Sequence, residues 1–282
     1  MSAEHELAAL CAALAVTRSG YQAWAKAEAS ARERTDALLL PKIKELHRLH
    51  KSRYGAPRIH DQLTRQGMRH GCKRIARLMR QAGLRGLSPK RYVPRTTQSD
   101  HDQPIAPNRL AERAAPTGPN QIWVNDLTYV RTDEGWLYVG VVMDLWSRKI
   151  VGWATGPSLH AELSGSALKM AIQHRQPARG LLHHSDRGVQ YASRAHRELL
   201  QAAGMEASMS RTGNPYDNAA MESFMATYKR ECVGLAQAQG GYATRAAATH
   251  DFFDYVEKYY NRVRTHSTLA YQTPVDFENQ LN

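Results

Sequence analysis

The 282-residue chain carries 38 Lys and Arg against 26 Asp and Glu, a net charge of +12 at pH 7, and 42% of its residues are hydrophobic. No apolar run approaches the ~20 residues that a membrane-spanning helix requires, and the Ala-rich, charged start lacks the order of a secretory signal. The three cysteines lie far apart, at no disulfide or zinc spacing, which favours free thiols in a reducing cytoplasm.

The positive charge is concentrated in one segment. Residues 42–95 hold 16 Lys and Arg against two acids, so their charge of +14 exceeds that of the whole chain. Such a segment attracts a polyanion, because bound phosphates release their counterions when Lys and Arg replace them. A solvated helix face is the alternative, but mutual repulsion among so many cations adds nothing to stability. The segment therefore predicts nucleic-acid binding.

The first 87 residues predict helices only. Two short helices are expected within residues 4–29, with Thr17 as an N-cap between them. Three more are expected over 38–51, 58–66 and 72–81, with Pro41 in the first turn of the first of these.

The helix over 72–81 carries a basic outer face. Lys73, Arg74, Arg77 and Arg80 lie opposite its apolar positions. A three-helix unit with a basic last helix fits the helix-turn-helix geometry, in which that helix enters the major groove of DNA. An ordinary helical linker domain is the alternative interpretation. Arg58, at the start of the preceding helix, is a further candidate for DNA contact.

From residue 120 the pattern changes to strands. Residues 88–119 are rich in Pro and predict a linker. Strands are then expected over 121–131, 136–146, 149–155, 181–185 and 206–210, and helices over 159–174, 193–203, 217–231 and 244–261. Three sequential strands followed by alternating helix and strand is the order of a ribonuclease-H-like α/β fold, a mixed five-stranded sheet with helices on both faces. The predicted domains are a small helical segment (1–30), a basic three-helix DNA-binding domain (36–87), the linker (88–119) and the core (120–277).

Three carboxylates lie on three separate elements of this core. Asp126 lies within the first strand, Asp186 ends the fourth, and Glu222 lies near the start of a later helix. Strands one and four are neighbours in this fold, so the two Asp side chains can converge. Carboxylate oxygens are the ligands that Mg²⁺ prefers, and two such ions can activate a nucleophile and stabilise a leaving oxygen. Asp126 is expected to bridge both ions, with Asp186 and Glu222 holding one each.

The spacing of the three carboxylates adds a second signal. Thirty-five residues separate Asp186 from Glu222, and Lys229 follows Glu222 by seven, on the same helix face. Several blocks of sequence accompany this spacing: 47–59 (HRLHKSRYGAPRI), 123–130 (WVNDLTYV), 135–153, 184–191 (HSDRGVQY), 208–223 (SMSRTGNPYDNAAMES) and 260–277. In these blocks the chain resembles bacterial insertion-sequence transposases with a retroviral-integrase-like DDE core, of the type encoded in a second reading frame. Asn125 departs from the family pattern, which usually has Thr there, but it removes no metal ligand.

The resemblance implies a function and its site. It implies a DDE-type polynucleotidyl transferase that hydrolyses phosphodiesters at element ends and transfers strands into target DNA, using Mg²⁺, or Mn²⁺ in its place. Double-stranded DNA, at both element ends and target, and further copies of the chain in the DNA complex are the implied partners, in a cytoplasmic, nucleoid-associated protein. Beside the triad, the candidate DNA contacts in the core are Lys229, Asn218, Arg187 and His184. For Asn218, capping of the helix is an equally good interpretation.

Other polar residues favour structural roles. Asp144 reads as a turn residue between two strands, and Asp217 as a helix cap. A zinc site at His183 and His184 is not expected, since adjacent strand residues point to opposite faces and no Cys pair accompanies them. Trp123, Tyr129 and Trp153 favour core or sheet-face packing over base stacking.

Two other functions fit part of the pattern. A ribonuclease-H-like nuclease would cut without joining, but the basic helical segment argues against it. A non-catalytic DNA-binding regulator would tolerate loss of the carboxylates. The resemblance also implies that the active enzyme is often a fusion with an upstream-frame product that supplies a coiled coil. No sustained heptad run occurs here, so the chain alone is expected to bind element ends weakly and to multimerise poorly.

Overall fold

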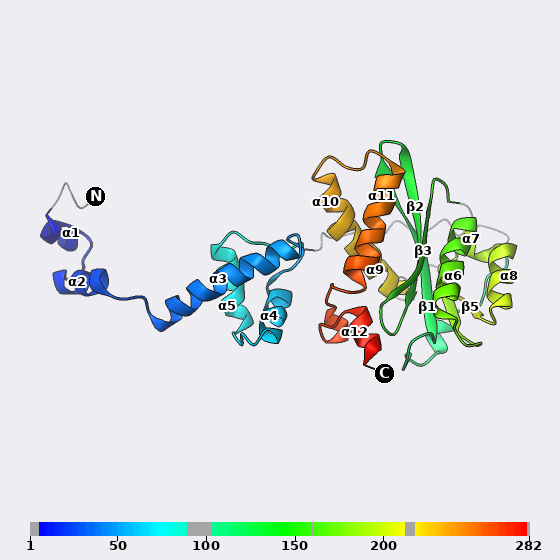
Figure 1. Ribbon diagram of the computed structural model, residues 1–282, viewed down its shortest axis with the longest axis horizontal. Coiled ribbons are helices and arrows are strands. Elements are labelled where there is room, and N and C mark those ends of the chain that lie inside the picture. Colours follow the sequence, from blue (N-terminus) through cyan, green and yellow to red (C-terminus); the bar gives the residue numbers. More distant parts are fainter. Residues whose placement is uncertain (1–5, 89–102, 160, 212–217, 281–282) are drawn as a thin grey trace. The chain divides into compact units, whose positions relative to one another are not determined.

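The computed structural model describes residues 6–88, 103–159, 161–211 and 218–280, and it divides into two compact units, one ending at Gly86 and the other beginning at Leu87 (Figure 1). In the first unit every regular element is an α-helix. Its helices are α1 (Leu7–Ala13), α2 (Arg18–Lys26), α3 (Ala31–Leu49), α4 (Ala56–Arg65) and α5 (Cys72–Gln81). The predicted N-cap at Thr17 is confirmed, since its side chain accepts a hydrogen bond from the Gly20 N–H.

Helix α3 is longer than predicted and places Pro41 in its interior. It begins at Ala31, where Ser30 and Glu33 form a reciprocal capping box that satisfies two of the free N–H groups at the helix start. The prediction that Pro41 lies in a first turn was therefore wrong. The capping box, which was not predicted, starts the helix almost three turns upstream of Pro41.

The core of the first unit lies between α3, α4 and α5. Apolar side chains recur on the facing sides of the three helices and are almost fully buried, among them Leu39, Ile43, Ile59, Leu63, Ile75 and Leu78. The turn after α4 ends at Gly67, whose φ of 83° is a conformation that favours glycine. The three-helix arrangement predicted for this segment is therefore observed.

The second unit is built on one five-stranded sheet. Its strands are β1 (Ile122–Thr132), β2 (Gly135–Asp144), β3 (Ile150–Gly156), β4 (Leu182–Ser185) and β5 (Glu206–Met209), in the spatial order β3-β2-β1-β4-β5. The pairs β1–β2 and β2–β3 are antiparallel, whereas β1–β4 and β4–β5 are parallel. This is the mixed sheet that the sequence predicted, with β1 and β4 side by side.

Helices cover both faces of the sheet (Figure 1). Helix α6 (Ala161–Arg175) packs on β2 and β3 over a core that includes Trp123, Val142 and Leu168, and α7 (Val189–Ala192) and α8 (Arg194–Ala202) contact it. On the other face, α9 (Ala219–Tyr228) packs on β1, and α11 (Arg245–Phe253) packs on β1 and β2. The larger core lies there and includes Val139, Phe224, Tyr228 and Phe252.

Two of the helices on this second face continue into π-helical turns. Residues Lys229–Val233 follow α9 and lead to α10 (Gly234–Gln237), and residues Asp254–Tyr260 follow α11. A buried ion pair joins the region of these turns to the next loop: Arg264 Nε and Nη2 donate to Glu231 at 2.8 and 2.9 Å. The pKa of Arg264 is raised, because the bonds to Glu231 outweigh burial.

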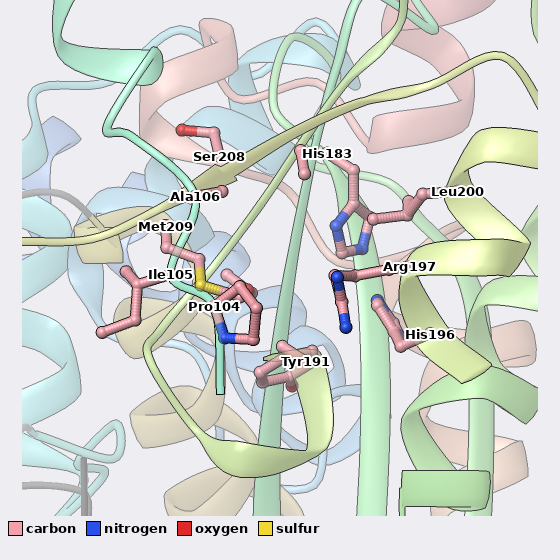
Figure 2. Close-up of a pocket in the computed structure, with 12 residues that line it drawn as sticks. Pro104, Ile105, Ala106, His183, Tyr191, His196, Arg197, Leu200, Ser208 and Met209 are labelled. Carbon is pink, nitrogen blue, oxygen red and sulfur yellow. The ribbon is translucent and has the colours of Figure 1, made fainter. Parts of the chain in front are cut away.

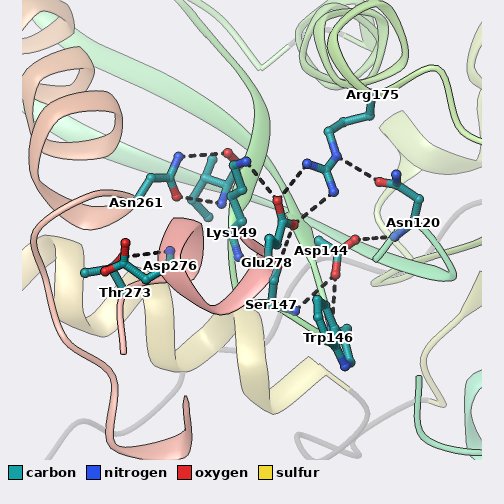
Figure 3. Close-up of polar contacts among 11 residues, drawn as sticks. Asn120, Asp144, Trp146, Ser147, Lys149, Arg175, Asn261, Thr273, Asp276 and Glu278 are labelled. Atoms are coloured by element: carbon teal, nitrogen blue, oxygen red, sulfur yellow. Dashed lines mark hydrogen bonds and ion pairs between the residues drawn. The ribbon is translucent and has the colours of Figure 1, made fainter. Parts of the chain in front are cut away.

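The C-terminal helix α12 (Pro274–Asn279) is fixed to the sheet by a polar network (Figure 3). Glu278 accepts hydrogen bonds from Arg175 at 2.8 and 2.9 Å, from Lys149 at 2.9 Å and from Ser147 at 2.8 Å. Asp144 accepts backbone N–H bonds from Asn120, Trp146 and Ser147. The structural role predicted for Asp144 is confirmed.

No helix within the described residues has the length and apolar character needed to cross a lipid bilayer.

Candidate active site and nucleic-acid interface

Asp126 and Asp186 are brought together by the register of two parallel strands. Asn125 on β1 pairs with Ser185, the last residue of β4, so Asp186 follows β4 beside Asp126. Asp126 itself pairs on its other side with Val141 of β2. One Asp therefore lies within the central strand and the other at the end of its neighbour, as the sequence predicted.

The electrostatics of Asp126 link it to the other two predicted carboxylates. Burial raises the pKa of Asp126 to about 7, and the charges of Asp186 and Glu222 add to the increase. A hydrogen bond from the Leu127 N–H at 2.8 Å and the charge of Lys229 act in the opposite direction. A carboxyl group with so high a pKa in the company of other acids is typical of a functional site.

Glu222 and Lys229 reach the site from α9 and the turn that follows it. Glu222 is exposed in the first turn of α9, and burial raises the pKa of its carboxyl group. Lys229 begins the π-helical turn and is half-buried; burial lowers the pKa of its ammonium group, and attraction to Asp126 partly offsets the change. Met221, Phe224 and Tyr228 anchor α9 in the core and thereby position both side chains.

The loop after β4 is held by backbone contacts. Asp186 Oδ1 accepts a hydrogen bond from the Gly188 N–H at 2.9 Å. Arg187, a candidate for DNA contact, is half-buried and donates from Nε to the carbonyl oxygen of Ser210 at 2.7 Å. This bond ties the end of β4 to the end of β5 and places Arg187 next to Asp186.

His184 is an internal residue. Its side chain is fully buried, and its Nδ1 and Nε2 lie 2.9 and 3.0 Å from the hydroxyl oxygens of Ser208 and Ser210. The expectation that His184 contacts DNA is therefore wrong in this structure, because β5 covers the imidazole. The signal for this was the alternation of the short strand, which places His184 and Val124 on the same, covered face of the sheet.

A cavity of about 140 Å³ lies behind the active-site strands (Figure 2). Figure 2 shows His183, Tyr191 and His196 around it, with Pro104, Ile105 and Ala106 from the segment that precedes β1. The Tyr191 hydroxyl group donates to Asn125 Oδ1 at 3.1 Å, and Asn125 Nδ2 lies 3.4 Å from His183 Nε2. Asn125 thus supports the strand next to Asp126 from the opposite face, a role that needs no metal.

The described residues contain no ready-made metal cage. No three His, Cys, Asp or Glu side chains in that part of the chain form a group that could hold an ion as they stand. The prediction against a zinc site at His183 and His184 stays a prediction. The chemistry of the acids is nevertheless suited to a divalent cation, since Asp126 is buried beside a second carboxylate with a third in range, and each positive charge brought there would relieve their repulsion.

The basic helix of the first unit is only partly free. Lys73 and Arg80 on α5 are exposed. Arg74 and Arg77, in contrast, both pair with Asp36 on α3, at 2.6 Å for Arg74 Nε. The prediction that all four form an outer face was therefore wrong for Arg74 and Arg77, because an acid 38 to 41 residues earlier in the chain pins them to α3. Arg58 is half-buried, and its guanidinium lies 5.3 Å from the centre of the Tyr54 ring.

Comparison with known proteins agrees with both units. Residues 116–215 and 203–274 match two families that are each described as an Integrase core domain, and residues 33–92 match an HTH-like domain. The chain is 37% identical over 284 residues to transposase InsF for insertion sequence IS3A of Escherichia coli (strain K12), covering 99% of this chain and 96% of InsF. The chain belongs to this family of insertion-sequence transposases.

Two further comparisons extend the match. The transposase is 41% identical over 273 residues to an insertion element IS600 uncharacterized 31 kDa protein of Shigella sonnei, covering 97% and 98% of the two chains. A simian T-cell lymphotropic virus intasome, solved in complex with a PP2A regulatory subunit, matches with a TM-score of 0.50 at 15% identity, over 84% of this chain and 74% of the viral chain. That likeness shows the integrase fold. A match along nearly the whole chain to a named transposase favours neither the nuclease nor the regulator interpretation.

Asn218 adds a polar group next to Glu222 in the transposase. It is buried at the N-cap position of α9, yet its side chain makes no capping hydrogen bond, so the capping interpretation was wrong. Its Oδ1 is buried and has no hydrogen-bond partner among the described residues. Residues 212–217, and with them the predicted cap Asp217, lie outside the described residues.

Aromatic residues near the active site divide into two groups. Trp123 is fully buried, and Trp153 packs against Phe252 and donates to Glu257, as predicted. Tyr129 lies on a sheet face, but it is 53% exposed and is not part of the core of the transposase. Its partners at the end of the β1–β2 hairpin, Tyr138 and Trp136, were not singled out in the sequence. The available signal was that three aromatic residues fall on the same face of one hairpin.

Proposed function

We propose that this transposase uses Asp126, Asp186 and Glu222 to hold divalent cations and, with them, hydrolyses a phosphodiester at each element end and joins the freed 3′-hydroxyl to target DNA. The supporting observation is the raised pKa of Asp126, which results from burial and from the charges of Asp186 and Glu222. A bound divalent cation would relieve the mutual repulsion of these carboxylates.

The proposal includes both the identity and the number of the cations. Mg²⁺ is the expected ion, with Mn²⁺ as a substitute, and two ions are expected. When bound, they would supply activation of the attacking oxygen and stabilisation of the leaving oxygen. Asp126 is the expected bridging ligand because it lies between the other two acids in the electrostatics of the site. Asp186 and Glu222 would hold one ion each.

The remaining residues of the site position the DNA. Lys229 is attracted to Asp126 and is half-buried beside it, so its ammonium group is placed to pair with a phosphate next to the one that reacts. Arg187 is tied to the backbone of Ser210 and directly follows Asp186, which places its guanidinium near the same strand. Asn218 lies one turn before Glu222, where its side-chain NH2 group would donate to the carboxylate and orient it.

The first unit would bind the element ends. Its HTH-like match covers α3 to α5, and Lys73 and Arg80 are exposed on α5. Both are expected to contact DNA phosphates, with Arg58 of α4 as a further contact. A homo-oligomer on DNA, and fusion or binding to an upstream-frame product, remain part of the proposed active form.

The test is a joining reaction. A labelled duplex that carries a candidate element end is incubated with plasmid DNA in Mg²⁺ or Mn²⁺, with the full chain and with Asp186→Asn and Glu222→Gln. The proposal predicts joining by the wild type and a loss of at least about 1,000-fold in each variant, roughly 4 kcal/mol of barrier. Binding of the duplex in EDTA should be unchanged. Joining by Asp186→Asn in Mg²⁺ would refute the assignment of ligands.

A second readout is independent of activity. Thermal unfolding of the full chain is followed at pH 8 with and without Mg²⁺, for the wild type and for Asp126→Asn. Bound cations should raise the unfolding temperature of the wild type and have a much smaller effect on Asp126→Asn. An equal shift in both proteins would show that any bound ion lies elsewhere.

A further inference from the structure

An aromatic patch is exposed at the free end of the β1–β2 hairpin. It consists of Tyr129, Trp136 and Tyr138, here called the hairpin patch, and Tyr129 and Trp136 are 53% and 42% exposed. The Tyr129 and Trp136 ring centres lie 5.0 Å apart, edge to face, and those of Tyr129 and Tyr138 lie 6.4 Å apart. Exposed aromatic side chains that contact one another in this way form a rigid apolar surface with several accessible ring faces.

The architecture of the core explains why the patch is uncovered. The pairing of β1 with β4 ends at Asn125 and Ser185, so the outer half of β1 has an open edge on that side. Helix α6 covers the sheet at Gly140, where an added Cβ would lie 3.4 Å from the Leu163 carbonyl oxygen. Two residues further along β2, Tyr138 is half-buried, and Trp136 beyond it is exposed. The hairpin therefore extends past the helix and past the neighbouring strand.

Two cations accompany the rings. Lys229 Nζ lies 5.1 Å from the centre of the Tyr129 ring, and the Arg131 guanidinium lies 5.8 Å from that of Trp136. The patch thus combines accessible rings with positive charge, the combination that binds single-stranded nucleic acid through stacked bases and backbone phosphates. The complementary partner carries both an aromatic face and negative charge.

Lys229 also links the hairpin patch to the carboxylates. The same ammonium group that lies over Tyr129 is attracted to Asp126. Along β1, Tyr129 follows Asp126 by three residues, or about 10 Å, and the two side chains point to opposite faces of the strand. Lys229 joins the two faces around the outer edge of β1, because its ammonium group lies over the Tyr129 ring and is attracted to Asp126. A DNA strand whose phosphate reacts at Asp126 and that follows Lys229 around this edge would therefore reach the patch within a few nucleotides.

We propose that the hairpin patch binds an unpaired nucleobase of the DNA substrate, stacked on Tyr129 and supported by Trp136, within about three nucleotides of the reacting phosphate. Stacking is tolerant of sequence, because every base has a flat aromatic face. The patch would thereby favour DNA whose end is frayed or single-stranded next to the cleavage point. This inference rests on the proposed function for the position of the DNA, but the binding itself needs no metal or reaction.

The experiment compares two duplexes of the same sequence. One is fully paired, and the other has a three-nucleotide unpaired tail at the candidate element end; 2-aminopurine replaces one tail base at a time. Affinity and 2-aminopurine fluorescence are measured with the full chain in EDTA. The variants are Tyr129→Ala, Tyr129→Phe and Trp136→Ala. Phe253→Ala is a matched control, because Phe253 is 38% exposed and Lys258 Nζ lies 5.6 Å from its ring centre.

The wild type should bind the tailed duplex more tightly than the paired one, with a fluorescence change at one tail position. Tyr129→Ala should lose roughly 5- to 150-fold in affinity for the tailed duplex, together with the fluorescence change. Tyr129→Phe and Phe253→Ala should behave like the wild type, and Trp136→Ala should fall between. Since Tyr129 is exposed, the unfolding temperature of its variants should change little.

Three results would overturn the inference. The first is equal binding of both duplexes by the wild type, and the second is equal loss on both duplexes in Tyr129→Ala. The third is a change in oligomeric state on Tyr129→Ala, seen by sedimentation without a change in tail preference, which would identify the patch as a contact between copies of the chain. A joining reaction with the same DNA separates the two proposals. Joining without tail preference refutes the patch alone, whereas a Tyr129-dependent preference without joining refutes the reaction alone.

Discussion

The two ends of the paired segment of β1 and β4, which runs from Ile122–Leu182 to Asn125–Ser185, treat nearby acids in opposite ways. At one end, Glu278 is surrounded by Arg175, Lys149 and Ser147, and these hydrogen bonds lower its pKa in spite of burial. At the other end, Asp126 has one backbone hydrogen bond and a half-buried lysine against two further carboxylates, and its pKa rises to about 7. Both ends gather acids on the same scaffold. The difference is that Glu278 has its cations built in, whereas Asp126 has one half-buried lysine against two further carboxylates, which we propose are neutralised by bound cations.

The largest predicted effect on stability is at the structural end. Glu278→Gln keeps the shape of the side chain but leaves Arg175 and Lys149 without their shared carboxylate. Because these groups are mostly shielded from water, the change should destabilise the protein by about 2–4 kcal/mol, measured by urea unfolding. The double variant Arg175→Met/Glu278→Leu is the control, and it should recover part of this loss because only the partly exposed Lys149 then keeps an uncompensated charge. A loss below about 0.5 kcal/mol in Glu278→Gln would mean that the network does not hold α12.

The next effect is at the functional end and has the opposite sign. The pKa of Asp126 is about 7 in the folded chain against an ordinary 3.8, so ionised Asp126 costs stability. This cost is absent below about pH 4, grows as the pH rises through 7, and is complete above it. Asp126→Asn should therefore stabilise the metal-free protein at pH 8 by about 2 kcal/mol, after allowance for partial solvation of the cleft, and have little effect at pH 4.5. Asp144→Asn, at the other end, should destabilise at both pH values. Destabilisation by Asp126→Asn at pH 8 would contradict the claim that ionised Asp126 lowers stability.

The smallest expected effects concern the basic helix α5, which also has both paired and unpaired charges. Lys73 and Arg80 are exposed, whereas Arg74 and Arg77 are held by Asp36. Lys73→Ala or Arg80→Ala should weaken DNA binding and reduce the slope of log affinity against log salt by about 0.9 each, with stability unchanged. Arg74→Ala should instead lower stability by a small amount. Equal salt slopes for all of these variants would show that the pairing with Asp36 does not survive on DNA.

The sequence predicted most of the core because its signals are local. Alternation along residues 121–131 and 136–146, with a turn between them, was enough to predict the hairpin. The spacing of Asp126, Asp186 and Glu222 and the family blocks predicted the catalytic carboxylates, and that assignment stays a prediction. Parallel pairing of β1 with β4 then brings the first two together without further information. The predicted domain boundaries remain predictions.

The features that sequence reasoning missed depend on partners far away in the chain. Arg175 meets Glu278 across 103 residues, and Arg77 meets Asp36 across 41, so neither pair could be predicted from local charge. His184 became an internal residue because Ser208 of the four-residue strand β5, and Ser210 just after that strand, place their hydroxyl groups against its imidazole. The exposure of Tyr129 depends on where α6 begins to cover the sheet and on where β4 ends. The residue pattern of β1 alone predicts neither of these positions.

The most direct test of the contrast between the two ends is to titrate the carboxyl groups. With ¹³C-labelled Asp in the full chain, the Asp126 resonance is assigned from Asp126→Asn and followed by NMR against pH, without metal and with saturating Mg²⁺. The account predicts a pKa near 7 for Asp126 in the metal-free protein and a fall of at least about two units when Mg²⁺ binds. An ordinary value near 4 in the metal-free protein, unchanged by Mg²⁺, would contradict it.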